Sequence, residues 1–213
     1  MTKLKGILLT EGMHGMISQV EGLAKALDIN YSHHTVETKG FWKVIPPKFT
    51  PISDSVFKKI ECEDVDLIIS CGRKSIIPSL FLKKNSKKKV FNIHIQNPKI
   101  KLDNFDLVVV PEHDNLDGHN VLKTKGAIHY LTSEEIEKDK EYLFSISSKL
   151  KDKNIISLII GGPTQYYDYS DRNIQEIFSK VNYLVKENNL NLVVIPSMRT
   201  PKGTIEHAKI YFG

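Results

Sequence analysis

Cysteine, arginine and long hydrophobic runs are all scarce in this sequence of 213 residues. Its two cysteines, Cys62 and Cys71, are too few for a disulfide framework and indicate a reducing compartment. The longest apolar stretches, such as residues 155–160, have the length of a strand, whereas a membrane-spanning helix needs about 20 residues. The first residues lead directly into a strand pattern and lack the features of a signal peptide. We therefore expect a soluble protein of the cytoplasm.

Only three of the 30 basic residues are arginines, at positions 73, 172 and 199. Lysine replaces arginine wherever a positive charge is enough, but not where a planar guanidinium must grip a phosphate or carboxylate. Arg73 and Arg199 both fall in expected strand-to-helix loops, so they are candidate anion-binding residues. The alternative for Arg73 is a surface ion pair.

The net charge of +5 comes from lysines that are spread along the chain. The densest run, residues 83–89, predicts a solvated loop, with contact to acidic lipid or nucleic acid as the alternative. No zinc-ligand spacing, helix-turn-helix pattern or interleaved aromatic residues accompany this run, so we do not expect nucleic-acid binding. With 40% hydrophobic and 26% charged residues, the composition is that of a globular protein.

The hydrophobic pattern predicts an α/β fold in two lobes. Strands are expected at residues 4–9, 66–70, 90–95 and 106–110, with a further short strand at 127–131. Several are continuously apolar, as in a parallel sheet that is covered on both faces. Helical patterns between them indicate βαβ units. We predict a complete Rossmann-like lobe over residues 1–132.

Residues 133–213 predict a connecting helix and a second, incomplete α/β lobe. The expected elements are a charged helix over 133–150, a strand at 155–160, a helix at 171–187, a strand at 190–195 and a helix after Pro201. Only two strands follow the connecting helix.

Ligands of open parallel sheets bind beyond the carboxyl ends of the strands. Glycine, histidine and arginine are concentrated in the loops expected there, whereas the opposite loops are plain polar turns. The candidate site residues are Gly12, His14, Gly15, Arg73, Gln96, Glu112 and His113 in the first lobe, and Gly161, Gly162, Ser197, Arg199 and Thr200 in the second.

The glycine-containing loops predict anion binding, because a turn before a helix presents backbone N–H groups to a negative charge. Gly12 and Gly15 lack the full G-x-G-x-x-G pattern, so plain turn glycines and an exposed His14 remain the alternative. Gly161 and Gly162 suggest a phosphate loop. Arg199, which lies between Ser197 and Thr200, suggests a group of three donors for a phosphate.

The segment Glu112–His113–Asp114 resembles a metal cluster only superficially, since its spacing matches no established site. We interpret it as a general base or a binder of sugar hydroxyl groups, with a hydrogen-bonded loop as the alternative. Cys71 is expected to be a small buried residue rather than a nucleophile.

Short motifs are spread over nearly the whole chain. They comprise Gly15 with Gln19 and Gly22–Ala24, Cys71–Ser75, Ile95–Pro98, Phe105–Asp114, Gly118, Asn120–Leu122, Gly126–Ala127, Gly161–Gly162 and Pro196–Pro201. Together they resemble the mitochondrial-fission "elongated mitochondria" family, a large bacterial group with plant members. The sequence departs from the family pattern at Asn97, where Asp is usual, and at Lys74, where a second Arg is common.

The resemblance implies a two-lobed glycosyltransferase of the GT-B type that moves a sugar from a nucleotide donor to an acceptor. It implies an acceptor in the first lobe, with His14 or Glu112–His113 as base, and donor phosphates near Gly161–Gly162 and Arg199. We expect no metal or other cofactor and a location at the inner membrane face. The alternative is a non-catalytic scaffold or peripheral membrane partner.

Some family members carry an older label as nucleotide-sugar epimerases. That chemistry requires a Tyr-x-x-x-Lys pair, and no tyrosine here has a lysine four positions later. Because family members are substantially longer, we expect a C-terminally truncated chain with weak or no transferase activity.

Overall fold

The computed structural model describes residues 3–62, 64–164, 166–167 and 169–213. The chain divides into two compact units, Met1–Thr132 and Ser133–Gly213. Each unit is an α/β structure with its own hydrophobic core.

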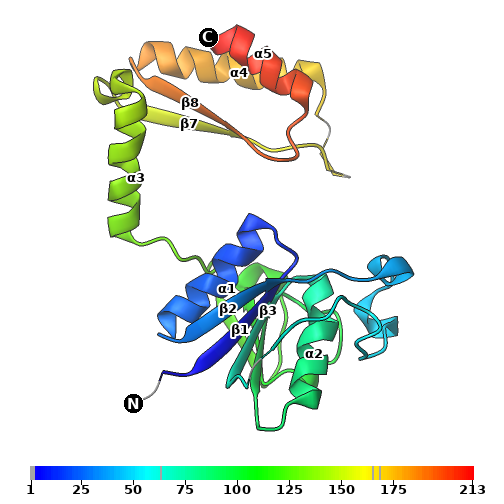
Figure 1. The fold of residues 1–213 in the computed structure, drawn as a ribbon. Helices are drawn as coiled ribbons and strands as arrows, with labels where there is room; N and C mark the ends of the chain where they lie inside the picture. Colours follow the sequence, from blue (N-terminus) through cyan, green and yellow to red (C-terminus); the bar gives the residue numbers. More distant parts are fainter. Residues whose placement is uncertain (1–2, 63, 165, 168) are drawn as a thin grey trace. The chain divides into compact units, whose positions relative to one another are not determined.

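The first unit is built on a six-stranded parallel sheet with the strand order β2-β1-β3-β4-β5-β6 (Figure 1). Its strands are β1 (Lys5–Thr10), β2 (Asn30–Thr35), β3 (Leu67–Cys71), β4 (Phe91–Ile95), β5 (Leu107–Pro111) and β6 (Val121–Thr124). The predicted Rossmann-like parallel sheet is thereby confirmed.

Helices α1 (His14–Ala26) and α2 (Ile76–Asn85) cover opposite faces of this sheet. Alternate strand residues point to opposite faces, so Leu8 and Ile69 pack with α1, whereas Val108 and Val110 pack with α2. Short 3-10 helices complete the connections, at Gly40–Lys43, Pro47–Phe49, Arg73–Ser75, Leu102–Asn104 and Glu112–Asp114.

Two parts of the first unit differ from the sequence-based prediction. Strand β2 was not predicted because it is a polar edge strand, so it lacks the hydrophobic pattern of a buried one. The strand expected at 127–131 is wrong: the sixth strand is β6, and the later segment runs across α1 instead. A Cβ on Gly22 of α1 would lie 2.6 Å from the carbonyl carbon of His129, so glycine permits this crossing.

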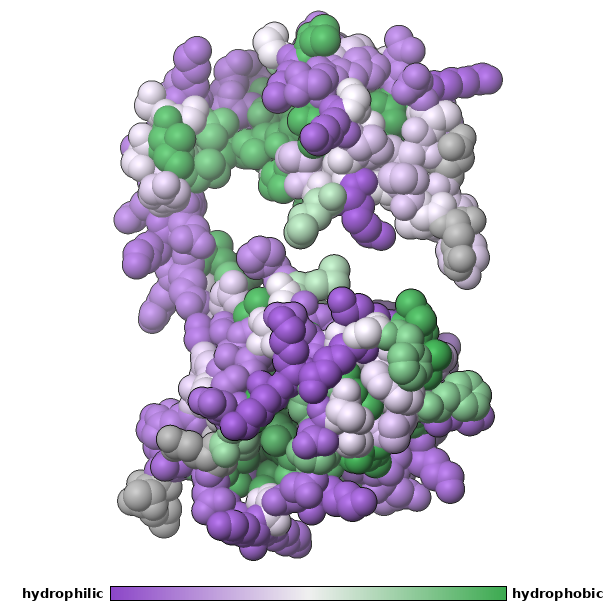
Figure 2. Space-filling model, turned by 45° about the vertical axis from the view of Figure 1, so that its right-hand side comes forward, coloured by the Kyte–Doolittle hydropathy of each residue, from purple (hydrophilic) through white to green (hydrophobic). Residues whose placement is uncertain are grey.

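The second unit contains a pair of parallel strands, β7 (Ile155–Ile160) and β8 (Asn191–Pro196), with α4 (Asp171–Glu187) and α5 (Lys202–Phe212). Its core combines residues of β7 and both helices: Ile160, Ile174, Phe178 and Ala208. Helix α3 (Ser133–Ile146) precedes these elements and buries no residue, and Figure 2 shows hydrophilic side chains along it. A 3-10 turn at Ser148–Lys151 leads from α3 towards β7.

Candidate functional site

The first-lobe candidate residues lie in loops at one edge of the sheet. Because all six strands are parallel, the loops after β1, β3, β4 and β5 share the carboxyl-terminal edge. The chain order along the sheet reverses between β1 and β3, which is where such sheets commonly bind ligands. The loops on either side of this point are therefore of most interest.

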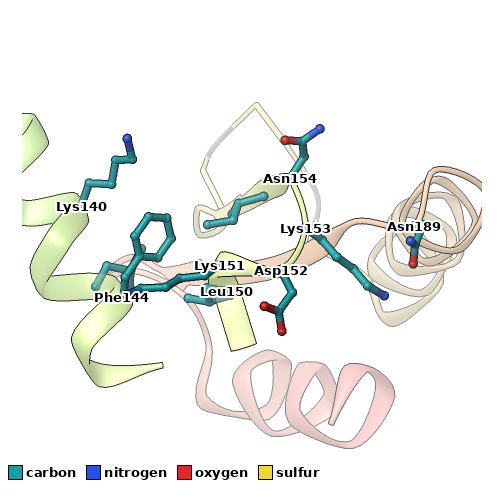
Figure 3. Close-up of a pocket in the computed structure, with 10 residues that line it drawn as sticks. Lys140, Phe144, Leu150, Lys151, Asp152, Lys153, Asn154 and Asn189 are labelled. Carbon is teal, nitrogen blue, oxygen red and sulfur yellow. The ribbon is translucent and has the colours of Figure 1, made fainter. Parts of the chain in front are cut away.

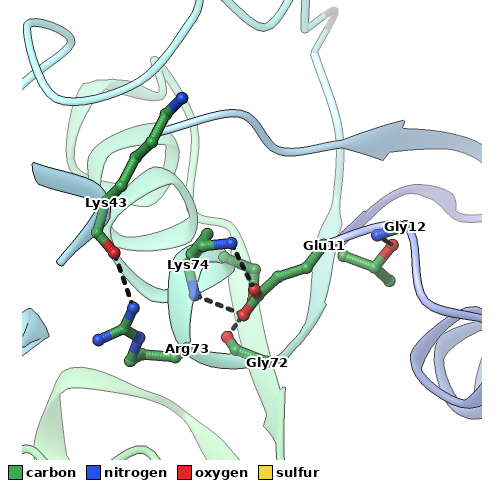
Figure 4. A network of polar contacts seen from close by, with 8 residues as sticks. Glu11, Gly12, Lys43, Gly72, Arg73 and Lys74 are labelled. Carbon is green, nitrogen blue, oxygen red and sulfur yellow. Dashed lines mark hydrogen bonds and ion pairs between the residues drawn. The ribbon is translucent and has the colours of Figure 1, made fainter. Parts of the chain in front are cut away.

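A carboxylate bridges the two loops at this point of reversal (Figure 4). Glu11 follows β1, and its Oε1 accepts a hydrogen bond of 3.0 Å from the backbone N–H of Lys74, after β3. The Oε2 atom of Glu11 lies 3.1 Å from Nζ of Lys74. Gly72 permits this approach, since a Cβ there would lie 3.0 Å from Oε1 of Glu11 and the φ of Gly72 is +93°. Glu11 was not singled out from the sequence, although it directly follows a buried strand.

The predicted residues Gly12, His14 and Gly15 lie at the start of α1. Gly12 has a φ of +83°, and its N–H donates to Oγ1 of Thr10 over 3.1 Å. The turn therefore requires glycine for its backbone conformation. His14 is the first residue of α1 and is exposed. A Cβ on Gly15 would meet no atom within 4 Å, so packing among the described residues does not require glycine there.

Arg73 is directed toward the connection between β2 and β3. Its Nη2 donates a hydrogen bond of 2.8 Å to the carbonyl oxygen of Lys43 (Figure 4). The guanidinium therefore holds the 3-10 helix Gly40–Lys43 against the loop after β3, a role that neither sequence interpretation had included.

A cavity of about 470 Å³ opens at the other half of this edge, beside α1, β4, β5 and β6. It has an apolar floor and a polar rim. The polar lining side chains are Gln19, Gln96, Asn97, Lys99, His113, Asp114 and Thr124, and the apolar ones include Ile95, Val109 and Ile128. We call this space the rim cavity.

The rim cavity brings together two of the predicted residues, Gln96 and His113. Gln96 has a φ of +86°, a backbone conformation that costs of order 1 kcal/mol or more and is often found at functional sites. The Nε2 atom of His113 lies 3.8 Å from Oδ1 of Asp114, and the His113 side chain is exposed at the rim.

The other predicted first-lobe residues, Gly12, His14, Gly15, Arg73 and Glu112, are not among the residues that line the rim cavity. The structure shows that Gln19, Asp114 and Thr124, which were not among the candidate site residues, also line the rim cavity. Gln19 and Asp114 are part of the sequence motifs described above, so a signal for both was present.

Cys71 ends β3 and is fully buried. Burial, reinforced by the nearby charge of Glu11, raises the pKa of the thiol to about 12. A thiol with this pKa is a poor nucleophile at neutral pH. Its expected role as a small buried residue agrees with this environment.

The predicted residues of the second unit are joined by hydrogen bonds between two loops. Thr200 Oγ1 lies 2.7 Å from the carbonyl oxygen of Ile160 and 2.8 Å from that of Gly161, and it accepts the N–H of Ser197 over 2.8 Å. Ser197 Oγ in turn accepts a hydrogen bond from the N–H of Arg199 over 3.3 Å. The Thr200 hydroxyl thus ties the loop after β8 to the end of β7, so the predicted group of three phosphate donors lacks this hydroxyl.

The two glycines after β7 have different surroundings. A Cβ on Gly162 would lie 2.1 Å from the carbonyl oxygen of Arg199, which no side chain can tolerate. A Cβ on Gly161 would meet no atom within 4 Å. Gly162 is therefore needed for the contact between the loops, whereas packing among the described residues does not require glycine at position 161.

The comparisons with known proteins place these observations in a family. The family model for "Mitochondrial fission ELM1" matches residues 14–210. The chain belongs to the mitochondrial fission ELM1 family. The resemblance seen in the sequence motifs is thereby confirmed.

A stretch of 48 residues is 35% identical to a protein from Arabidopsis thaliana, "Mitochondrial fission protein ELM1". The stretch covers 22% of this chain and only 11% of the plant protein. The search of the solved structures gave no match.

The second unit of this ELM1-family chain has a further cavity, of about 600 Å³, at the amino-terminal end of β7 (Figure 3). Lys140, Phe144 and Lys151 line it on the side of α3, and Nζ of Lys151 lies 5.9 Å from the centre of the Phe144 ring. Because it lies at the amino end of the strand, it does not have the position in which parallel sheets usually bind ligands.

Within the described ranges, no three His, Cys, Asp or Glu side chains lie where they could hold a metal ion. No helix of this part of the chain has the length and apolar character needed to cross a membrane.

Proposed function

We propose that this ELM1-family protein takes part in sugar transfer from a nucleotide sugar, and that the rim cavity holds the acceptor. The observation that carries the proposal is the lining of this cavity. Amide, carboxylate and hydroxyl groups can donate to and accept from sugar hydroxyls, and the apolar floor suits the flat face of a sugar ring. The protein is proposed to act as a peripheral protein at a membrane face.

In this proposal His113 is the general base that removes a proton from the acceptor hydroxyl. It lines the rim cavity and has the carboxylate of Asp114 beside it, whereas Glu112 and His14 do not line the cavity. A base must lie within hydrogen-bond reach of the proton it removes. Glu112 and His14 are therefore secondary candidates.

The donor phosphates are proposed to bind the loops after β7 and β8 of the second unit. The space beside Gly161 is open, and Arg199 and Ser197 offer donors that would stabilise the charge on a departing nucleotide. The nucleotide sugar is a substrate in this scheme, and no resident cofactor is proposed.

Saturation-transfer NMR with UDP-glucose, UDP-N-acetylglucosamine, GDP-mannose and a CMP-sugar tests donor binding by the purified chain. Release of the free nucleotide, with water as the acceptor, tests turnover. We expect binding of at least one donor, slow release, and a loss of release of about 100-fold or more in His113→Gln with donor binding unchanged. His119→Gln is the matched control, because His119 is exposed and does not line the rim cavity.

Absence of any saturation transfer and of any release would contradict the proposal. A non-catalytic scaffold with the same fold would then be the better interpretation.

A further inference from the structure

The connection between β2 and β3 exposes large apolar side chains to solvent. Phe41 is 65% exposed, Val44 73% and Phe49 70%. Isolated exposed hydrophobic residues are ordinary, but several within nine positions of one segment form a patch, and such patches commonly mark an interaction site. We call residues 39–52 the apolar segment.

The apolar segment is held in a defined conformation. Its first residue is fixed by the backbone, since the N–H of Lys39 donates to the carbonyl oxygen of Val56 over 2.7 Å, and Val56 is buried in the core. Arg73 binds the carbonyl oxygen of Lys43. The exposed side chains thus belong to a segment whose main chain is tied to the fold at Lys39 and Lys43.

A groove of about 570 Å³ adjoins the apolar segment and is apolar at its base and basic at its rim. Ile77 and Leu80 of α2 supply part of the base. Three exposed lysines, Lys48, Lys99 and Lys101, line the groove.

Positive charge predominates around this surface. The segments 39–54 and 99–104 contain five lysines, at positions 39, 43, 48, 99 and 101, against two aspartates, at positions 54 and 103. Figure 2, in which the right-hand side of Figure 1 is turned forward, shows hydrophobic side chains beside hydrophilic ones on the surface of the first unit. Lysine binds a phosphate through its charge alone, whereas arginine imposes a fixed, planar geometry on the contact.

We propose that the apolar segment and the adjoining groove form a docking surface for a membrane of anionic phospholipids. Phe41, Val44 and Phe49 enter the boundary between headgroups and acyl chains, and the lysines contact the lipid phosphates. Each lysine near an anionic surface contributes about 1 kcal/mol, so five of them add substantially to the burial of the apolar residues.

A bilayer fits better than a protein partner because the groove combines an apolar base with a lysine rim, as an acyl chain with an anionic head requires. This surface deepens the peripheral attachment to a membrane that is part of the proposed function, and it rests on that part. Its test involves no nucleotide sugar, so its failure would leave the proposed sugar transfer standing.

Trp42, the single tryptophan of the chain, is partly buried against the core, and its ring centre lies 4.3 Å from that of Phe41, so its emission responds to the surroundings of Phe41. The unsubstituted protein is mixed with vesicles of phosphatidylcholine alone, or with one third phosphatidylglycerol, and both co-sedimentation and tryptophan emission are measured. We expect binding and a blue shift with the anionic vesicles only, and weaker binding at high salt.

The double variant Phe41→Ser, Phe49→Ser should lose binding by about tenfold or more, while its circular dichroism spectrum stays that of the folded protein. Tyr142→Ser, Tyr183→Ser is the matched control, because both tyrosines are strongly exposed in the second unit, and this variant should bind as the unsubstituted chain does.

Equal binding to neutral vesicles, or unchanged binding of the Phe41, Phe49 variant, would overturn the proposal. The proposal would also be overturned if the unsubstituted protein bound no vesicles and the Phe41, Phe49 variant had a smaller particle size than the unsubstituted protein. The surface would then be an interface between protein chains.

Discussion

The carboxylate of Glu11 binds Lys74 through both of its oxygens, one to the backbone N–H and the other to the side-chain ammonium. The two residues lie on either side of the point where the strand order reverses. The first turn before α2, where an anionic ligand would find free N–H groups, is thus already occupied by a carboxylate of the chain. An anion that binds there has to displace Glu11.

The contact predicts a measurable stabilisation by Glu11. Glu11→Ala leaves the Lys74 N–H without its acceptor, and we expect the free energy of unfolding to fall by about 1–3 kcal/mol. Urea denaturation followed by Trp42 fluorescence measures the first unit. Glu61→Ala, at an exposed position of the same unit, is the control and should change stability by less than about 0.5 kcal/mol. Equal effects of the two substitutions would show that the bridge does not stabilise the fold.

The buried histidine of β4 predicts that stability depends on pH. Burial lowers the pKa of His94 from 6.5 to about 3, and its Nδ1 lies 2.9 Å from Oγ of Ser70. Between these two values the unfolded state binds more protons, so stability falls as the pH is lowered, by about 1.4 kcal/mol per pH unit. Relative to pH 7, about 2 kcal/mol should therefore be lost at pH 5.

The variant His94→Gln keeps a polar partner for Ser70 but cannot titrate, so its stability should change less over the same pH interval. Urea denaturation at each pH gives the difference between the two proteins. His119→Gln, at an exposed position, should retain the pH dependence of the unsubstituted chain. A His94→Gln variant with an unchanged pH dependence would refute this account.

The sequence identified the fold where burial leaves a hydrophobic pattern. The apolar strands β3 and β5 and helix α4 were predicted closely, because each packs one or two apolar faces against a core. Strand β2 was missed because its position at the sheet edge requires no apolar side chains. The segment 127–131 was mistaken for a strand because Ile128 is apolar, although it packs beside α1.

The sequence predicted the candidate site only in part, for a related reason. The rule that ligands bind after parallel strands selected Gln96 and His113, both of which line the rim cavity. It gave no means of separating ligand-binding residues from structural ones. The hydrogen bond between Thr200 and Ile160 joins residues 40 positions apart. No local sequence pattern therefore predicts that the Thr200 hydroxyl has a partner inside the protein.

The paired glycines after β7 predict opposite responses to the same substitution. Gly162→Ala places a Cβ against the main chain of Arg199, so we expect the second unit to lose at least about 2 kcal/mol of stability. Gly161→Ala meets open space and should change stability by less than about 1 kcal/mol. Thermal unfolding followed by circular dichroism compares the variants, with Trp42 fluorescence as a check that the first unit is intact. A tolerated Gly162→Ala would mean that the loops after β7 and β8 are not in this contact.

The open face of the two-stranded sheet predicts a difference between neighbouring isoleucines of β7. Ile159 is 73% exposed, on the face that α4 and α5 do not cover, whereas Ile160 is buried against these helices. Ile159→Thr should therefore cost less than about 0.5 kcal/mol, whereas Ile160→Thr should cost about 2 kcal/mol, because it removes a buried methyl group and buries a hydroxyl. Thermal unfolding measures both variants.

The same face predicts self-association, since exposed apolar strand residues promote contact between chains. Sedimentation at increasing protein concentration should show less association for Ile159→Thr than for the unsubstituted protein. Ile177→Thr, which changes an exposed isoleucine on α4, is the control and should leave association unchanged. If Ile159→Thr destabilised the protein as much as Ile160→Thr, Ile159 would have to be packed in solution, and the open face would not exist.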